Sequence, residues 1–177
     1  MKKLILFTVF FLSLSFISAQ EKAKSVFDIA RSGTLAELKD LMKKNPDVIN
    51  ETNEQNYSPL ILACYRGNME VVDFLIDNVK DINYNSPMGT ALMGVIFKGD
   101  LKLTQKLLDN KCDINKADSH GTTPLIFAAK LGNVDMVKLL IKYKAEKSII
   151  DKEGKTAFEY AVFSKNQELI NQLKNKI

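Results

Sequence analysis

The pattern of apolar, small and polar residues along this chain repeats about every 33 residues. Each copy begins with a hydroxyl residue, continues with proline or alanine, and then has a large apolar residue. The matching starts are Ser58-Pro59-Leu60, Thr90-Ala91-Leu92, Thr123-Pro124-Leu125 and Thr156-Ala157-Phe158, at spacings of 32, 33 and 33 residues. A second apolar segment follows each start, so the pattern predicts a pair of short helices in every copy.

The ends of the first segment in each copy favour a helix with defined limits. Thr123-Pro124 is a good helix start, because proline fixes φ and lacks the N–H that the first turn does not use. Ala128-Ala129 keeps one face of the helix thin, so the next pair of helices can approach closely. Gly132 stands where the helix must stop, and we expect a positive φ there. The last copy has Lys165 in the slot of this glycine.

These features resemble the ankyrin repeat, a unit of about 33 residues that contains one β-turn, two helices and a Thr-Pro-Leu-His-x-Ala run. The clearest copy reads Thr-Pro-Leu-Ile-Phe-Ala from Thr123 to Ala128, and the similarity extends over essentially all of residues 24–177. The resemblance implies an all-α repeat solenoid, in which helix-turn-helix units stack and are joined by β-turn or hairpin loops. One unit cannot bury its apolar side alone, so at least about three units are needed for stability.

The repeat divides residues 20–177 into one elongated domain of five units. Their approximate limits are 24–52, 53–85, 86–117, 118–150 and 151–177. The first unit lacks the Thr-Pro-Leu start and the last has a polar tail, so we expect them to be the N-terminal and C-terminal caps.

The third unit, residues 86–117, departs most from the pattern. It lacks one turn residue and carries Gly94 inside its first helix, which should cost roughly 0.5–1 kcal/mol relative to alanine. We therefore expect this unit to be the least stable. If the helix is regular, Gly94→Ala is expected to be neutral or stabilising.

Residues 1–19 have the pattern of a secretory signal peptide. Lys2 and Lys3 form a basic start, residues 4–17 form an apolar stretch, and Ser18-Ala19 offers a small-residue exit. This order predicts cleavage after Ala19. The apolar run is shorter than the ~20 residues that usually span a bilayer, which favours cleavage over an uncleaved anchor. We expect an exported, periplasmic protein without stable membrane insertion after cleavage; secretion and a membrane tether are the alternatives.

The formal charge says little about partners once the leader is removed. The whole chain has 25 basic and 21 acidic residues, a net charge of +4. Without Lys2 and Lys3 the basic residues number 23 and the charge falls to +2. Nucleic-acid binding would call for a strong basic stripe, so no nucleic-acid partner is expected. We expect a monomer.

No arrangement of residues suggests catalysis. His120 is the only histidine, and no cysteine or second histidine stands at ligand spacing from it. Phosphate-binding loops and hydrolase motifs are absent from the sequence, and Glu146 and Glu153 fit solvated surface positions. We therefore expect no enzyme activity, no metal and no cofactor. An enzyme or metal protein that uses His120 with nearby carboxylates is the alternative from a different class.

The two cysteines occupy different kinds of position. Cys64 replaces an alanine in the first helix of the second unit, whereas Cys112 begins the loop that closes the third. Their Cα atoms should lie beyond the roughly 7 Å that a disulfide permits. We expect both to be buried, unpaired thiols.

The resemblance implies a protein that binds another protein. Ankyrin repeats mostly contact partners with the tips of the turns and with the exposed side of the first helices, which together line a concave face. The turn tips here offer Tyr57, Met88, His120 and Lys152. The helices offer the two residues before each helix-ending slot, namely Arg31-Ser32, Tyr65-Arg66, Phe97-Lys98, Lys130-Leu131 and Phe163-Ser164.

We call these five residue pairs the groove ladder. It contains three aromatic residues, four cations and no acid, a composition that interface hot spots favour. The expected partner is a protein with an acidic or polar surface around an apolar centre. Alternatively, Phe97 and Phe163 fold inward to fill gaps left by Gly94 and by the irregular last unit. A secreted effector that binds host proteins is the alternative to a periplasmic binding protein.

Overall fold

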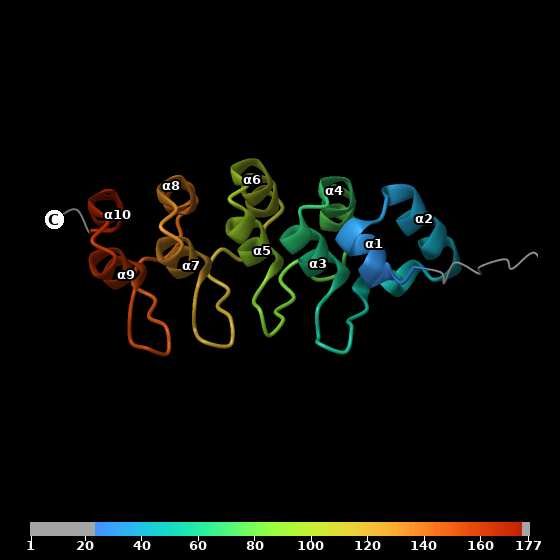
Figure 1. The fold of residues 1–177 in the computed structure, drawn as a ribbon, viewed down its shortest axis with the longest axis horizontal. Helices are drawn as coiled ribbons and strands as arrows, with labels where there is room; N and C mark the ends of the chain where they lie inside the picture. Colours follow the sequence, from blue (N-terminus) through green and yellow to red (C-terminus); the bar gives the residue numbers. More distant parts are fainter. Residues whose placement is uncertain (1–23, 175–177) are drawn as a thin grey trace, which may run out of the picture.

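Two rows of helices run along the molecule, one above the other (Figure 1). The computed structural model describes residues 24–174, so the expected signal peptide, residues 1–19, lies outside the described residues. The inner row consists of α1 (Val26–Ser32), α3 (Pro59–Arg66), α5 (Ala91–Lys98), α7 (Pro124–Lys130) and α9 (Ala157–Phe163). The outer row consists of α2 (Leu35–Lys44), α4 (Met69–Asn78), α6 (Leu101–Asp109), α8 (Val134–Lys142) and α10 (Gln167–Leu173). The predicted all-α repeat solenoid is confirmed.

The helix starts and stops follow from the residues that the sequence places there. The side-chain oxygens of Ser58, Thr90, Thr123 and Thr156 accept hydrogen bonds from backbone N–H groups in the first turns of α3, α5, α7 and α9. Such N-caps stabilise a helix by about 1 kcal/mol. Gly132 has φ 72°, as expected, and Lys165 adopts φ 54° in the corresponding slot. The lysine therefore carries backbone strain that the glycine avoids.

The apolar core is a continuous strip between the two rows and between neighbouring units. Leu125 of α7 and Leu140 of α8 are fully buried, and Ala128 has no exposed surface. Small residues at this inner position let one inner helix lie close to the next. Each unit thus buries its apolar side mainly against its neighbours, as expected for a solenoid.

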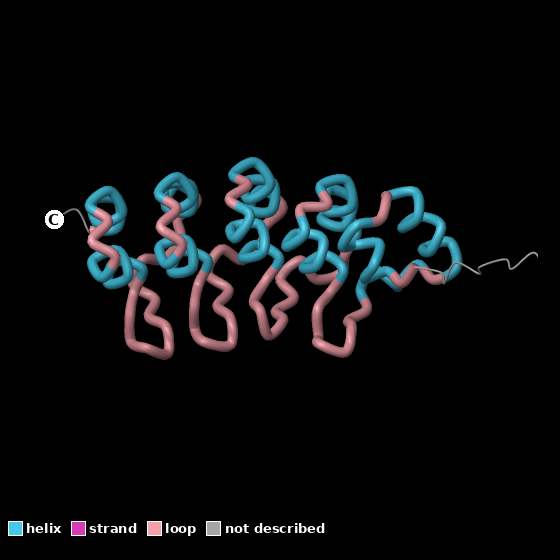
Figure 2. The backbone as a smooth tube through the Cα atoms, viewed as in Figure 1, coloured by secondary structure: helices cyan, strands magenta, loops and turns pink. Residues whose placement is uncertain are grey.

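The loops project from the inner row toward one side of the molecule (Figure 2). In three of them, the side chain of the first turn residue accepts two backbone N–H bonds, and this residue is Asn53, Asp118 or Asp151. The third unit has a shorter turn, closed by a bond from Ser86 N to Gly89 O of 3.1 Å. The predicted loss of one turn residue is confirmed.

A row of asparagines, Asn50, Asn83 and Asn115, joins successive units. Asn50 Oδ1 accepts a bond of 2.8 Å from Lys80 N, and Asn83 Oδ1 accepts one of 2.6 Å from Asp113 N. Asn115 Oδ1 accepts a third, of 3.0 Å, from Glu146 N. Each bond links one unit to the backbone of the next. A short 3-10 helix, η1 (Pro46–Asn50), places Asn50 at the start of this row.

Both cysteines are buried and unpaired, as predicted. Burial raises the pKa of the Cys112 thiol to about 12 and also raises the pKa of Cys64. Thiols of this kind carry little thiolate and react slowly.

Within residues 24–174, no helix has the length and apolar character needed to cross a membrane.

Candidate functional site

The groove ladder lies at the C-terminal ends of the inner helices α1, α3, α5, α7 and α9. Several of its apolar members are open to solvent. Phe97 is 57% exposed and Phe163 is 78% exposed, while Leu131 and the turn residue Met88 are also exposed. The alternative in which Phe97 and Phe163 fold inward is therefore wrong. Large exposed apolar side chains gathered on one face are typical of interaction surfaces.

Tyr65 fills the space that Gly94 leaves open. A Cβ atom at Gly94 would lie 3.0 Å from Tyr65 Cδ2 and 3.2 Å from Cys64 Cβ. The Tyr65 ring lies 5.9 Å from the Phe97 ring, centroid to centroid, and its hydroxyl donates a bond of 2.9 Å to Met88 O. Burial raises the pKa of the Tyr65 hydroxyl. Gly94 therefore permits close packing, and the structure does not favour the expectation that Gly94→Ala is harmless.

An open hollow of about 350 Å³ lies beside Tyr65, between α1, α3 and the turns before α3 and α5. Its walls come from ladder residues, turn tips and the buried face of α3. We call it the arginine hollow, and its lining residues are Arg31, Tyr57, Ile61, Leu62, Tyr65, Arg66 and Met88. The structure thus brings three ladder residues, Arg31, Tyr65 and Arg66, and two turn-tip residues, Tyr57 and Met88, together around one concave site. The sequence pattern placed them on one face without predicting a hollow.

Cations in the N-terminal half of the ladder are largely free. Within the described part of the chain, Arg66 and Lys98 are exposed and neither forms an ion pair. Arg31 Nη1 lies 3.5 Å from Asp28 Oδ1, a contact at the long end of the range for a hydrogen bond. These groups can approach a partner's carboxylates without first breaking a strong internal contact.

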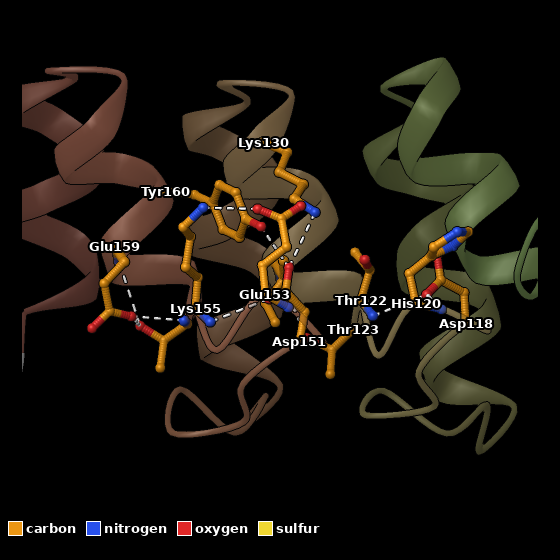
Figure 3. Close-up of polar contacts among 12 residues, drawn as sticks. Asp118, His120, Thr122, Thr123, Lys130, Asp151, Glu153, Lys155, Glu159 and Tyr160 are labelled. Atoms are coloured by element: carbon orange, nitrogen blue, oxygen red, sulfur yellow. Dashed lines mark hydrogen bonds and ion pairs between the residues drawn. The ribbon is translucent and has the colours of Figure 1, made fainter.

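Lys130, by contrast, is held by a buried carboxylate (Figure 3). Its Nζ atom lies 3.2 Å from Asp151 Oδ2 and 4.3 Å from the centre of the Tyr160 ring. The Tyr160 hydroxyl donates a bond of 2.6 Å to the same oxygen. We call Lys130, Asp151 and Tyr160 the Asp151 cluster. It ties the turn of the last unit to α7 of the unit before it.

Hydrogen bonds keep the Asp151 carboxylate ionised. The side chain is 2% exposed, and burial alone would raise its pKa. Its carboxylate accepts hydrogen bonds from the side chains of Tyr160 and Lys130 and from the backbone N–H groups of Lys155 and Glu153. These bonds outweigh burial and lower the pKa of Asp151 to about 2. Hydrogen bonds to the charged form act in this direction.

The C-terminal end of the groove combines an exposed aromatic ring with a neutralised cation. Lys155 Nζ lies 5.4 Å from the centre of the Phe163 ring and 5.5 Å from that of Tyr160. The same ammonium lies 2.7 Å from Glu153 Oε2. The sequence placed Lys155 at a turn tip, but sequence reasoning did not identify Asp151 and Tyr160 as members of this site. The one available signal was that Asp151 repeats the turn position of Asp118.

His120 and Lys152 meet through the backbone at the turn tips. Lys152 N donates a bond of 2.9 Å to His120 O, while both side chains are exposed. His120 Nδ1 lies 3.4 Å from Ser119 Oγ and 3.9 Å from Asp118 Oδ2. Among residues 24–174, no group of three or more His, Cys, Asp or Glu side chains is arranged to hold a metal ion.

Known proteins share this sequence pattern. The chain matches the family model described as "Ankyrin repeats (3 copies)" over residues 26–118 and 92–177. It is 33% identical to rat ankyrin repeat and SAM domain-containing protein 6 over 141 residues, which are 79% of this chain and 12% of the rat protein. It is 30% identical to an ankyrin repeat protein of fowlpox virus over 141 residues, which are 75% of this chain and 41% of the viral protein. A Rickettsia bellii ankyrin repeat protein is 36% identical over 58 residues, 33% of this chain and 34% of that protein.

The chain therefore spans less than half of each of these relatives. The matches agree with the helix pairs, the Thr123-Pro124 helix start and the projecting turns described above. The chain belongs to the ankyrin-repeat family, whose repeats are protein–protein interaction modules that generally act as non-enzymatic scaffolds.

Proposed function

We propose that this protein is exported to the periplasm and there binds a partner protein through the groove ladder and the turn tips. One observation carries the binding surface: exposed aromatic rings and free cations lie together on one face. Phe97 and Phe163 are more than half exposed, while Arg66 and Lys98 lack ion-pair partners within residues 24–174. Aromatic and arginine side chains in such a setting are enriched among the residues that dominate binding energy.

The free charges favour an acidic partner surface. In the N-terminal half of the ladder, Arg66 and Lys98 face solvent, and Arg31 has one long contact to Asp28. A carboxylate-rich surface would be attracted to these cations and steered toward the groove during encounter. We propose a single partner bound by a monomer of this chain, with Phe97 among the residues that make apolar contacts.

Site-specific photocrosslinking tests the binding surface. A photoreactive phenylalanine analogue replaces Phe97 in cells that make the protein, and Lys102, exposed on outer helix α6, is replaced by the same analogue as the control. Light should attach a discrete protein to the Phe97 position and not to the Lys102 position. Attachment at Lys102 alone would place the interaction on the outer row and contradict the proposal.

Export rests on the basic start at Lys2-Lys3, the apolar stretch of residues 4–17 and the exit at Ser18-Ala19. Intact-mass measurement of protein from its native cells should give a chain that starts at, or within a residue or two of, Gln20. Cell fractionation should recover this chain in the periplasm. A chain that still carries Met1 would indicate a membrane tether, and recovery from the medium would favour a secreted effector.

A further inference from the structure

We infer that the arginine hollow is the anchoring point of the groove. It takes one bulky apolar side chain of the partner, flanked in the partner's sequence by carboxylates that pair with Arg66 and Arg31. This inference rests on the proposed function, because it names the chemistry of the segment that the groove binds. The occupant is therefore an acidic segment of another protein with an apolar residue at its centre.

The floor of the arginine hollow is apolar. Ile61 and Leu62 of α3 form part of it, and they are 2% and 9% exposed. Tyr57 and Met88 form walls on the side of the turn tips. Removing an apolar side chain from water into such a site is favourable roughly in proportion to the area buried. The hollow thus selects a large apolar residue at the centre of the bound segment.

The rim of the hollow carries both arginines of the chain. Arg31 comes from the C-terminal end of α1 and Arg66 from the C-terminal end of α3, whereas the other 23 basic residues are lysines. A planar guanidinium can bind a carboxylate through two parallel hydrogen bonds, which a lysine ammonium cannot do. The position of both arginines at one hollow matches carboxylates on either side of the inserted residue.

The walls of the hollow are fixed before a partner arrives. The Tyr65 hydroxyl donates to Met88 O, and the Tyr65 ring packs against Gly94. Met88 N in turn donates a bond of 3.2 Å to Ser86 Oγ, which holds the turn tip. Side chains that are already ordered lose less entropy on binding. A preformed site of this kind suits a small number of strong contacts.

The remaining ladder offers fewer free charges to an acidic segment. Lys130 is paired with Asp151, and Lys155 beside Phe163 is paired with Glu153. Carboxylates of the partner can therefore pair with Arg66 and Lys98, next to the hollow, which form no ion pair in the part of the chain that the structure describes. The acidic part of the segment should lie over the units that contain α1, α3 and α5.

A displayed library of random twelve-residue peptides, selected on the purified full chain, tests the inference. Selected peptides should share a central Leu, Ile, Met or Phe with Asp or Glu on either side. Their affinity should fall at least about tenfold with Arg66→Gln, and by a similar factor when the central residue of the peptide becomes alanine. Arg66→Lys should give an intermediate loss, because the charge remains and the two-point contact does not.

Lys102→Gln is the matched control, since it removes one positive charge from an exposed position on the outer row. It should change affinity less than about twofold. Arg66 is exposed, so a thermal melt should show both variants folded like the unchanged protein.

Selection of no peptide, of basic peptides, or of peptides unaffected by Arg66→Gln would overturn the inference. Peptides that ignore Arg66→Gln but lose affinity with Phe163→Ala would reject the hollow and still support a groove that binds proteins. The proposed function itself is tested separately, by the crosslinking experiment at Phe97 and Lys102.

Discussion

The two ends of the groove use the same repeat positions in different ways. Near the N-terminus, the Tyr65 hydroxyl donates to the carbonyl of Met88 in the following turn, and the neighbouring Arg66 forms no ion pair with any residue from 24 to 174. Near the C-terminus, Lys130 reaches the carboxylate of Asp151 in the following turn and its charge is neutralised. Both residues tie an inner helix to the next turn. Only the first leaves a cation available to a partner.

Whether a ladder residue is available thus depends on the next unit. Tyr65 and Lys130 can donate hydrogen bonds and are drawn toward the turn that follows. Phe97 and Phe163 have no polar atom to offer and stay exposed. An ankyrin groove is therefore better described by pairs of a helix end and the following turn than by the helix ends alone.

The largest effect is expected from Leu125→Ala, which tests whether the two ends of the groove belong to one cooperative stack. Leu125 is fully buried on α7, so its truncation should lower the free energy of unfolding by about 2–5 kcal/mol. Urea melts provide the measurement. Leu131→Ala, at the exposed end of the same segment, should cost less than about 0.5 kcal/mol. Two separate unfolding transitions would mean that the ends fold independently.

Removing one hydroxyl from each end compares the two ties directly. Tyr160→Phe deletes a bond to a buried carboxylate and should cost about 1.5–3 kcal/mol, whereas Tyr65→Phe deletes a bond to a carbonyl and should cost about 0.5–1.5 kcal/mol. Chemical denaturation of both variants measures the difference. Equal losses would show that the charge of Asp151 adds nothing to the tie.

Acid should weaken the C-terminal end more than the N-terminal end. The pKa of Asp151 is about 2 in the folded protein, below the value of about 3.9 for an unfolded chain. The stabilisation is therefore present above about pH 4 and is lost as the pH falls toward 2, by an amount on the order of 1–2 kcal/mol.

Asp151→Asn should remove this part of the pH dependence, which unfolding melts between pH 5 and pH 2 would measure. Asn53 organises the second turn with the same two acceptor bonds, so an asparagine at position 151 can preserve the local turn. Asp118→Asn is the matched control, because Asp118 accepts the same two backbone bonds but forms no ion pair with a lysine among residues 24–174. An unchanged acid profile in Asp151→Asn would contradict the assignment.

The smallest effect is expected at Gly94. A methyl group there would press on Tyr65 and Cys64, and overpacking costs about 1–3 kcal/mol. Alanine also lowers the conformational entropy of the unfolded chain, which stabilises the folded protein by about 0.4–1 kcal/mol. The net effect of Gly94→Ala should be a loss of about 1 kcal/mol in the free energy of unfolding. Thermal melts should show a lower midpoint. A higher midpoint would restore the expectation drawn from the sequence and show that Tyr65 moves aside easily.

The sequence was sufficient for the repeat and for the limits of its helices. Thr123-Pro124 and Gly132 act through local backbone chemistry, so their effects can be read from neighbouring residues alone. Close packing of neighbouring units could also be predicted, because Ala128 and Ala129 leave one face of the inner helix thin. The period also aligns the ladder residues, because positions one repeat apart occupy the same place in each unit, but the exposure of Phe97 and Phe163 came from the structure.

The contacts between units could not be read from the sequence. In the Asp151 cluster, Tyr160 is 9 positions and Lys130 is 21 positions away from Asp151 along the chain. Neither spacing matches the period of the repeat. Likewise, Gly94 gains its role from Tyr65, a residue of the previous unit. Side chains that reach across a unit boundary depend on rotamers and on three-dimensional proximity, which a pattern of residue types does not specify.

The row of asparagines makes the length of this molecule adjustable. The unit of residues 86–117 presents both halves of the connection, a backbone donor at Asp113 toward Asn83 and an acceptor at Asn115 toward Glu146. A duplicate inserted after residue 117 would bring its own donor and its own acceptor, so each new boundary could be joined as the old ones are. Such an insertion would move the arginine hollow one layer further from the Asp151 cluster without altering either. The number of inserted units would then set the distance between the two ends of the groove.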